Sequence, residues 1–134
     1  MIKEEKREFS IPTHIKHKGK NIYLNLNAYR NWHHFNSNTY KKNYKARIYE
    51  ILDSSFLFSG KVHIEYTYYS PDKRVRDLMN VISIADKFLQ DALVELGYIS
   101  ADDTSVVVKI TSVFGGMDRE NSRIDVKINN FKQE

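Results

Sequence analysis

The sequence predicts an α+β fold: a single domain with a mixed β-sheet of about four or five strands and two main helices. Three observations predict it. The chain has 134 residues, a length at which one hydrophobic core is usual. Residues 61–69 alternate apolar and polar side chains, as a half-buried strand does. Residues 80–96 repeat apolar side chains every three or four positions, as an amphipathic helix does. The expected order is β-β-α-β-α-β-β within one domain, residues 1–134.

The N-terminal region is expected to form a hairpin. Two short apolar or alternating runs, Phe9–Ile15 and Asn21–Leu26, flank the turn signal Lys18-Gly19. Residues 27–43 then lack strong periodicity and predict a loop or an irregular start to a helix.

The first helix is expected within Tyr44–Phe58, where Gly60 would close it. Four apolar residues there recur at helical spacing: Ile48, Ile51, Leu52 and Phe56. The strand Lys61–Tyr69 follows, and Ser70-Pro71-Asp72 breaks it.

The C-terminal region is expected to hold the second helix and two strands. The helix covers Asn80–Leu96, and Gly97 supplies its stop. The β-branched run Ser105–Phe114 predicts a strand, Gly115-Gly116 a turn, and Ser122–Phe131 the last strand.

Composition excludes several classes of function. The chain is 41% hydrophobic and 28% charged, as in an ordinary soluble globule. It has no cysteine, which excludes disulfides, thiolate metal sites and cysteine nucleophiles. The sequence has no apolar run long enough for a membrane span and no signal peptide, so a cytoplasmic protein without a membrane partner is expected. Two histidine pairs, His14 with His17 and His33 with His34, lack a third ligand at a recognisable spacing and do not predict zinc.

The charge is divided unequally along the chain. Residues 1–76 hold 15 Lys and Arg against 7 Asp and Glu, while residues 77–134 hold 6 against 10. A basic half suits a polyanion, and an acidic half suits a divalent cation that bridges to the polyanion's phosphate. The alternative explanation is solubility alone.

Aspartates and one lysine mark the second half of the chain. Asp77 precedes the second helix, and Asp102-Asp103 follow it. Lys87 and Asp91 share a face of that helix with Asn80. Carboxylates that hold magnesium can activate water and neutralise a phosphate during phosphodiester cleavage, and a lysine can stabilise the developing charge.

These residues carry a resemblance to a known family. The series Asp77-x-x-Asn80, Lys87-x-x-x-Asp91-Ala92-Leu93 and Asp102-Asp103 resembles the D-x-D-N, K, D-A-L and D-D pattern of RusA-like Holliday-junction resolvases. The segment Asn27-Ala28-Tyr29-Arg30 is similar to that family's N-terminal asparagine-tyrosine-arginine segment. The resemblance covers roughly residues 11–128.

The resemblance implies a RusA-like fold and a homodimeric, Mg²⁺-dependent endodeoxyribonuclease, in which Mn²⁺ would substitute. Its partner would be branched DNA, above all four-way junctions, and it would need no small-molecule cofactor. Many such enzymes are encoded by phages or prophages. The roles expected here are catalytic for Asp77, Lys87 and Asp103, metal-binding for Asp77, Asp86, Asp102 and Asp103, and supporting for Asn80 and Asp91.

Two departures from the family pattern affect the expected metal site. Met79 stands at the second aspartate of D-x-D-N and cannot bind magnesium. The spacing from Asn80 to Lys87 is about one helical turn longer than usual. Asp86, next to Lys87, is the candidate replacement ligand. Asp91 is either a supporting group or a salt-bridge partner of Lys87, and Asp102-Asp103 could instead serve as turn and capping residues.

Cations and aromatic rings predict the DNA contacts. Basic residues lie among Tyr40, Tyr44 and Tyr49, a mixture that suits phosphates beside partly unstacked bases, although a solvated helix face has the same composition. Trp32 and Phe35 are expected in the core or at a dimer surface rather than as a base wedge. The expected DNA-binding residues are Asn27, Tyr29, Arg30, Lys41, Lys42, Lys45, Lys73, Arg74 and Arg76.

Two other functions fit the same residues. A less selective nuclease for flaps or replication forks would use the same aspartates. A catalytically weak or inactive protein that binds branched DNA would have lost the aspartate replaced by Met79.

Overall fold

The computed structural model describes residues 5–52 and 56–131. Its elements follow the chain as β1 (Lys6–Ile11), β2 (His14–His17), β3 (Lys20–Tyr23), α1 (Leu26–Asn31), α2 (His34–Ile51), β4 (Val62–Ser70), α3 (Leu78–Leu96), β5 (Val107–Met117) and β6 (Arg123–Asn130). The expected α+β class with a mixed sheet is confirmed.

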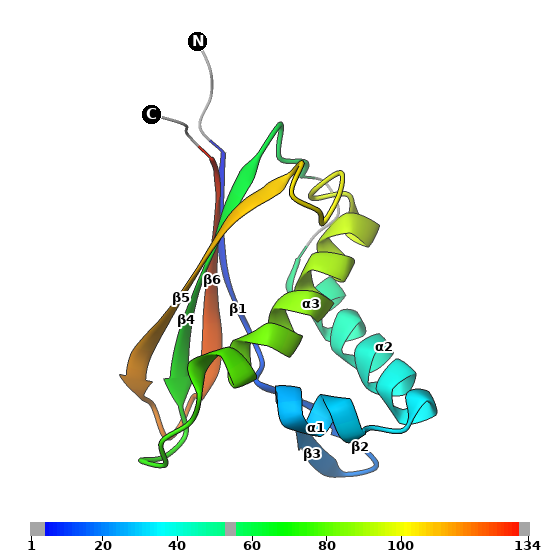
Figure 1. Cartoon of the computed structure of the whole chain (residues 1–134), viewed down its shortest axis with the longest axis vertical. Helices are drawn as coiled ribbons and strands as arrows, with labels where there is room; N and C mark the ends of the chain where they lie inside the picture. The colour runs from blue at the N-terminus through cyan, green and yellow to red at the C-terminus, as the bar shows by residue number, and fades with distance from the viewer. Residues whose placement is uncertain (1–4, 53–55, 132–134) are drawn as a thin grey trace.

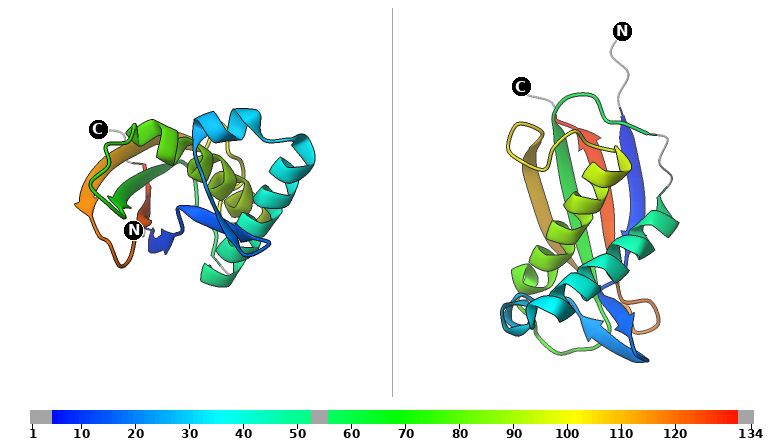
Figure 2. Two further views of the ribbon diagram at one scale, coloured as in Figure 1. Left: turned by 90° about the horizontal axis from the view of Figure 1, so that it is seen from below. Right: turned by 90° about the vertical axis from the view of Figure 1, so that its right-hand side faces the viewer.

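A four-stranded sheet in the order β1-β6-β4-β5 forms one layer, and the helices pack against one of its faces (Figures 1 and 2). β6 is antiparallel to both β1 and β4, whereas β4 and β5 are parallel. Parallel neighbours need a long crossover, and α3 supplies it. Among the strands of the described residues, β5 is therefore an edge strand that pairs on one side only.

The residues that begin, bury and end α3 are easily identified in the sequence. Asp77 caps its N-terminus, and its apolar positions 81, 82, 84, 85, 88, 89, 92 and 93 are buried. Gly97 ends it with φ 81°, a left-handed conformation in which its N–H reaches the carbonyls of Leu93 and Val94. Glycine adopts this conformation at little steric cost, which explains why the helix stops there.

α2 crosses beside α3, and Tyr40, Tyr44 and Ile48 are its buried residues, one turn apart. The small β2–β3 hairpin and α1 lie together at one end of the molecule (Figure 1). The turn of this hairpin lies at Lys18-Gly19, as predicted, and the two residues have φ angles of 51° and 76°.

One continuous core joins the sheet to the helices. Its largest fully buried side chains include Tyr44, Tyr66, Phe88 and Tyr98. Among residues 5–52 and 56–131, no helix has both the length and the apolar character that crossing a bilayer requires.

The N-terminal half differs from the prediction in three places. The predicted first strand divides at residues 12–13, so that β1 joins the main sheet and only β2 forms the hairpin. Residues 27–43, predicted as a loop or irregular helix start, contain α1 except for its first residue, Leu26, and the first part of α2. The helix predicted for Tyr44–Phe58 ends at Ile51, and residues 53–55 of that range lie outside the described residues.

The predicted Gly115-Gly116 turn is also wrong, because β5 continues through both glycines to Met117. The pairing with β4 skips Gly115, between Tyr68 opposite Phe114 and Tyr69 opposite Gly116. These glycines therefore accommodate a bulge, a role that glycine shares with turns.

Candidate nucleic-acid interface

The N-terminus of α3 exposes Asp77, the first carboxylate of the expected set. Its side chain accepts a 3.0 Å hydrogen bond from the backbone N–H of Met79. A capping aspartate satisfies an N–H that has no partner within the helix. Met79 is itself 50% exposed, and Asn80 is half-buried in the same turn.

The loop of residues 71–76, hereafter the basic loop, is held by one carboxylate. Asp72 accepts two hydrogen bonds from Arg76, at 2.8 and 3.0 Å, and one of 2.9 Å from the backbone N–H of Arg74. The Arg76 guanidinium, together with that N–H, lowers the pKa of Asp72 to about 2. The side chains of Lys73 and Arg74 are exposed, and neither forms an ion pair within residues 5–52 and 56–131. Two cations of this loop are thus available to a phosphate.

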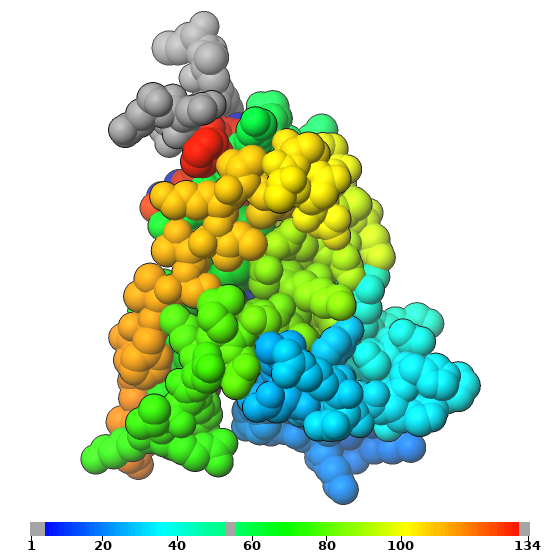
Figure 3. All heavy atoms as spheres, viewed as in Figure 1, coloured from blue at the N-terminus to red at the C-terminus, as the bar shows by residue number. Residues whose placement is uncertain are grey.

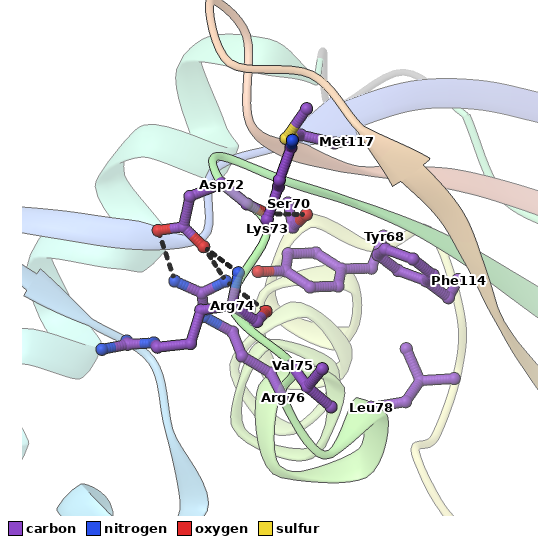
Figure 4. A pocket seen from close by; sticks show the side chains of 10 residues that line it. All are labelled: Tyr68, Ser70, Asp72, Lys73, Arg74, Val75, Arg76, Leu78, Phe114 and Met117. Carbon is purple, nitrogen blue, oxygen red and sulfur yellow. Dashed lines mark hydrogen bonds and ion pairs between the residues drawn. The ribbon is translucent and has the colours of Figure 1, made fainter.

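An apolar pocket of about 400 Å³ lies beside the basic loop. In Figure 3 the loop (green) projects at one end of the molecule, next to the last part of β5 (orange). Figure 4 shows the side chains of Tyr68 and Phe114 next to each other in this pocket, which Leu78 also lines. The pocket therefore combines residues of β4, β5 and α3 with the loop itself.

Lys87 and Tyr29 are brought together although they are 58 residues apart. The Lys87 ammonium donates a 3.0 Å hydrogen bond to the Tyr29 hydroxyl and lies 5.0 Å from the centre of its ring. Tyr29 also packs edge-on against Trp32 and Phe88. Part of the role of Tyr29 is thus to dock α1 on α3. Asn27 and Arg30 are exposed on the same short helix.

The basic residues of α2 are less free than expected. Lys41 forms a 2.6 Å ion pair with Asp91, which raises the pKa of Lys41. Lys45 pairs with Glu95, which also accepts a hydrogen bond from Tyr49. These contacts join α2 to α3, so the charges of Lys41 and Lys45 are largely neutralised. Of the expected α2 cations, Lys42 is exposed and forms no such pair among the described residues.

The same contacts correct the expectation for Asp91. The sequence left open whether Asp91 is a supporting residue or a partner of Lys87. Its ion-pair partner is Lys41 on the neighbouring helix, and Lys87 contacts Tyr29 instead.

Asp86 faces the sheet rather than the solvent. It accepts a hydrogen bond from the Tyr66 hydroxyl, which is part of β4, and a 2.8 Å hydrogen bond from Gln90. Burial raises the pKa of Asp86, while the two hydrogen bonds act in the opposite direction. Asp86 is thus a half-buried, hydrogen-bonded carboxyl, and among residues 5–52 and 56–131 it is not part of any group of three side chains that could hold a metal ion.

Asp102 and Asp103 are exposed in the loop after α3. Asp103 accepts hydrogen bonds from the backbone N–H of Ser105, at 2.9 Å, and from its hydroxyl. These hydrogen bonds lower the pKa of Asp103. The backbone carbonyl of Asp103 accepts from Val106 and Val107, which begins β5. This is the turn and capping chemistry that the sequence also allowed.

One chain does not bring the expected metal ligands together. Asp77 precedes α3 and Asp103 follows it, and a helix of 19 residues is about 28 Å long. The strand pairing gives the same separation. Val106, close in sequence to Asp103, accepts a hydrogen bond from Val62 at the start of β4, whereas Asp77 lies beyond the end of β4. Within residues 5–52 and 56–131, no three carboxylate or histidine side chains are grouped to hold a metal ion. The aspartates of a single chain therefore do not fit one magnesium ion.

The pocket beside the basic loop was not predicted from the sequence. Tyr68 and Phe114 are assigned to strands by their local pattern, which does not reveal that they meet across the parallel pair β4–β5. In the sequence, the pocket could have been inferred only from apolar residues inside or next to charged segments, namely Val75 and Met117. Trp32 packs against the core as expected, while Phe35 is 68% exposed.

Neither of two comparisons with known proteins gives a relative. No protein-family model matches the chain, and no curated protein matches it.

Proposed function

We propose that this protein is a structure-selective endodeoxyribonuclease that binds branched DNA, above all four-way junctions, as a homodimer. The observation that carries the proposal is the position of Asp77. Its exposed carboxylate directly follows the basic loop, in which Lys73 and Arg74 are exposed and unpaired within the described residues. A DNA phosphate bound by these cations would lie next to a carboxylate, the combination that phosphodiester cleavage uses. The resemblance to RusA-like resolvases supports the same reaction.

Two copies are part of this proposal for a geometric reason. Asp77 and the pair Asp102-Asp103 occupy opposite ends of α3, so they cannot act on one phosphate within one chain. In a dimer with two-fold symmetry, the start of α3 in one copy can face the end of α3 in the other. Each catalytic centre would then take Asp77 from one copy and Asp102-Asp103 from the second. Mg²⁺, or Mn²⁺ in its place, is proposed as the cofactor of this shared site on the strength of the resemblance.

Lys87 receives a different role from the one expected. Ten residues of helix separate it from Asp77, or about 15 Å along the axis. With Tyr29 beside it, Lys87 is better suited to bind a phosphate of a neighbouring nucleotide than to act at the reacting one.

The first experiment measures cutting of a labelled four-way junction, a flap and a linear duplex, each with and without magnesium. The proposal expects magnesium-dependent cutting of the junction in preference to the duplex. Preference for the flap would favour the less selective nuclease.

The second experiment tests the shared site by mixing two inactive variants. Asp77→Asn and Asp103→Asn should each abolish cutting while retaining junction binding. In a mixed dimer, one centre carries both changes and the other carries neither. Half of the dimers in an equal mixture are mixed, so mixing should restore about a quarter of the wild-type activity. Mixing two preparations of the same variant is the control. A mixture that stays inactive although mixed dimers form would reject the shared site.

A second candidate function is a branched-DNA-binding protein without cutting activity. It is favoured by Met79, which occupies the position of the family's second aspartate, and by the scattered carboxylates of the single chain. Junction binding without cutting in either metal would support it.

A further inference from the structure

The apolar pocket beside the basic loop is unusual because so much of its lining is exposed. Phe114 is 57% exposed, Met117 44% and Val75 94%. Single exposed apolar side chains are ordinary, but a group of them around one hollow marks a binding site. Phe114 lies on the edge strand β5, whose outer side no other strand of the described residues covers.

The floor and wall of the pocket are aromatic. Tyr68 is only 4% exposed and forms the floor, and its ring centre lies 6.0 Å from that of Phe114. Leu78, in the first turn of α3, adds an aliphatic surface (Figure 4). The volume of about 400 Å³ lies in the range of small-molecule sites. A flat, apolar ring system is the shape that such walls accommodate.

The rim of the pocket is cationic. Lys73, Arg74 and Arg76 border it, and Asp72 is the one carboxylate among its lining residues. Because Asp72 is already bound by Arg76, the rim keeps an excess of positive charge carried by Lys73 and Arg74. An apolar hollow with a cationic rim favours a ligand that has an aromatic body and negative charges beside it. A purely apolar protein segment would leave both cations without a partner.

We propose that this pocket receives one unpaired nucleobase of a branched DNA, while Lys73 and Arg74 bind the phosphates next to it. The inference rests on the proposed function, because it requires DNA as the partner. Branch points contain bases that are easily unstacked, and stacking on aromatic side chains recovers part of the cost of unstacking. Stacking tolerates any base, so the pocket selects for structure rather than for sequence. The bound base would also hold the adjacent backbone near Asp77.

The test uses a DNA duplex with one extrahelical 2-aminopurine, whose fluorescence reports stacking, and the same duplex with an abasic site in its place. Wild-type protein should change the fluorescence of the probe and bind the base-containing DNA more tightly than the abasic DNA. Phe114→Ala should weaken binding of the base-containing DNA about tenfold, within the range found for base stacking, and leave the abasic DNA unchanged. Met117→Ala, as a second variant, should act in the same direction.

Val113→Ala is the matched control. Val113 is adjacent to Phe114 in the same strand and is 48% exposed, but it pairs with Thr67 in register and so faces the opposite side of the sheet. It should bind both DNAs as the wild type does. A double change of Lys73 and Arg74 to Ala should weaken binding of both DNAs to the same extent and reduce the salt dependence of binding by about two charges.

The two proposals fail differently. If the wild type binds no DNA, both are rejected. If it binds branched DNA but Phe114→Ala and Met117→Ala retain the preference for the extrahelical base, only the pocket assignment is rejected. A change of oligomeric state in Phe114→Ala, with unaltered discrimination between base and abasic site, would assign the pocket to a second copy of the chain instead.

Discussion

The Lys87 ammonium donates a 3.0 Å hydrogen bond to the Tyr29 hydroxyl and thereby joins α1 to the middle of α3. The contact links the N-terminal segment that resembles RusA-like resolvases to the lysine of the same resemblance. Lys87 itself is exposed, as is Arg30 on α1. Lys87 lies ten residues along α3 from Asp77, so the pair belongs to a part of the proposed DNA-binding surface that is distinct from Asp77.

Lys87→Ala is expected to weaken junction binding and to leave the cutting rate at saturating DNA nearly unchanged. Loss of one phosphate contact should also lower the salt slope of binding by about one charge. Tyr29→Phe keeps the ring and serves as the control, with a stability loss of at most about 1 kcal/mol from the missing hydrogen bond. Fluorescence titration and single-turnover cutting separate the two effects. A large fall of the rate at saturating DNA would instead show that Lys87 acts at the reacting phosphate.

Lys41 and Lys42 are adjacent in sequence and are expected to behave differently. Lys41 pairs with Asp91 at 2.6 Å, whereas Lys42 is exposed. Lys41→Ala should lower the free energy of unfolding by about 0.5–1 kcal/mol, since the pair is partly exposed, and should change DNA affinity little. Lys42→Ala should leave stability unchanged and weaken DNA binding. Urea denaturation and DNA titration of both variants check this. A loss of DNA affinity in Lys41→Ala and a loss of stability in Lys42→Ala would contradict it.

Local sequence pattern predicted the elements that have strong local causes. β4 alternates at every position, and α3 has both a capping aspartate and a terminal glycine, so these two were placed within a residue or two. The first part of α2, before Tyr44, was not predicted as regular helix because Tyr40, its one buried residue there, lies among polar neighbours. Such a helix is stabilised by packing against α3 rather than by its own pattern.

The candidate site was predicted in composition but not in geometry. Asp77, Lys87 and Asp103 are exposed as a functional site requires, yet order along the chain does not reveal that α3 separates its two ends. The partners of Asp86 and Asp91 come from β4 and α2, elements that only the folded chain brings to them. Long-range pairing of this kind leaves no periodic signal in the sequence.

Gly115→Ala is expected to destabilise the protein by about 1–3 kcal/mol, the usual cost of overpacking. A Cβ atom at this position would lie 2.7 Å from the Thr67 methyl group and from the Tyr69 ring, so both side chains would have to move. Gly115 lies at the β5 bulge, where little room is left beside β4. Thermal unfolding measures the loss. The double variant with Thr67→Ser, which removes one of the two contacts, should recover part of the lost stability. If Gly115→Ala alone causes no loss of stability, the close approach of position 115 to Thr67 and Tyr69 is contradicted.

Asp86→Asn is expected to stabilise the protein at neutral pH and to reduce the dependence of stability on pH. Burial raises the pKa of Asp86 above the ordinary value of 3.8, so the folded protein holds this proton more tightly than the unfolded chain. The stability associated with that proton is fully present below pH 3.8 and is lost as the pH rises through the raised pKa.

The asparagine side chain cannot ionise, and its carbonyl oxygen can still accept hydrogen bonds from Tyr66 and Gln90. The difference in the free energy of unfolding between variant and wild type should therefore grow in favour of Asp86→Asn as the pH rises from about 4 and become constant above the raised pKa. Urea denaturation of both proteins across the acidic to neutral range measures this difference. A difference that stays constant over the whole range would mean that the Asp86 carboxyl ionises in the folded protein as readily as in the unfolded chain.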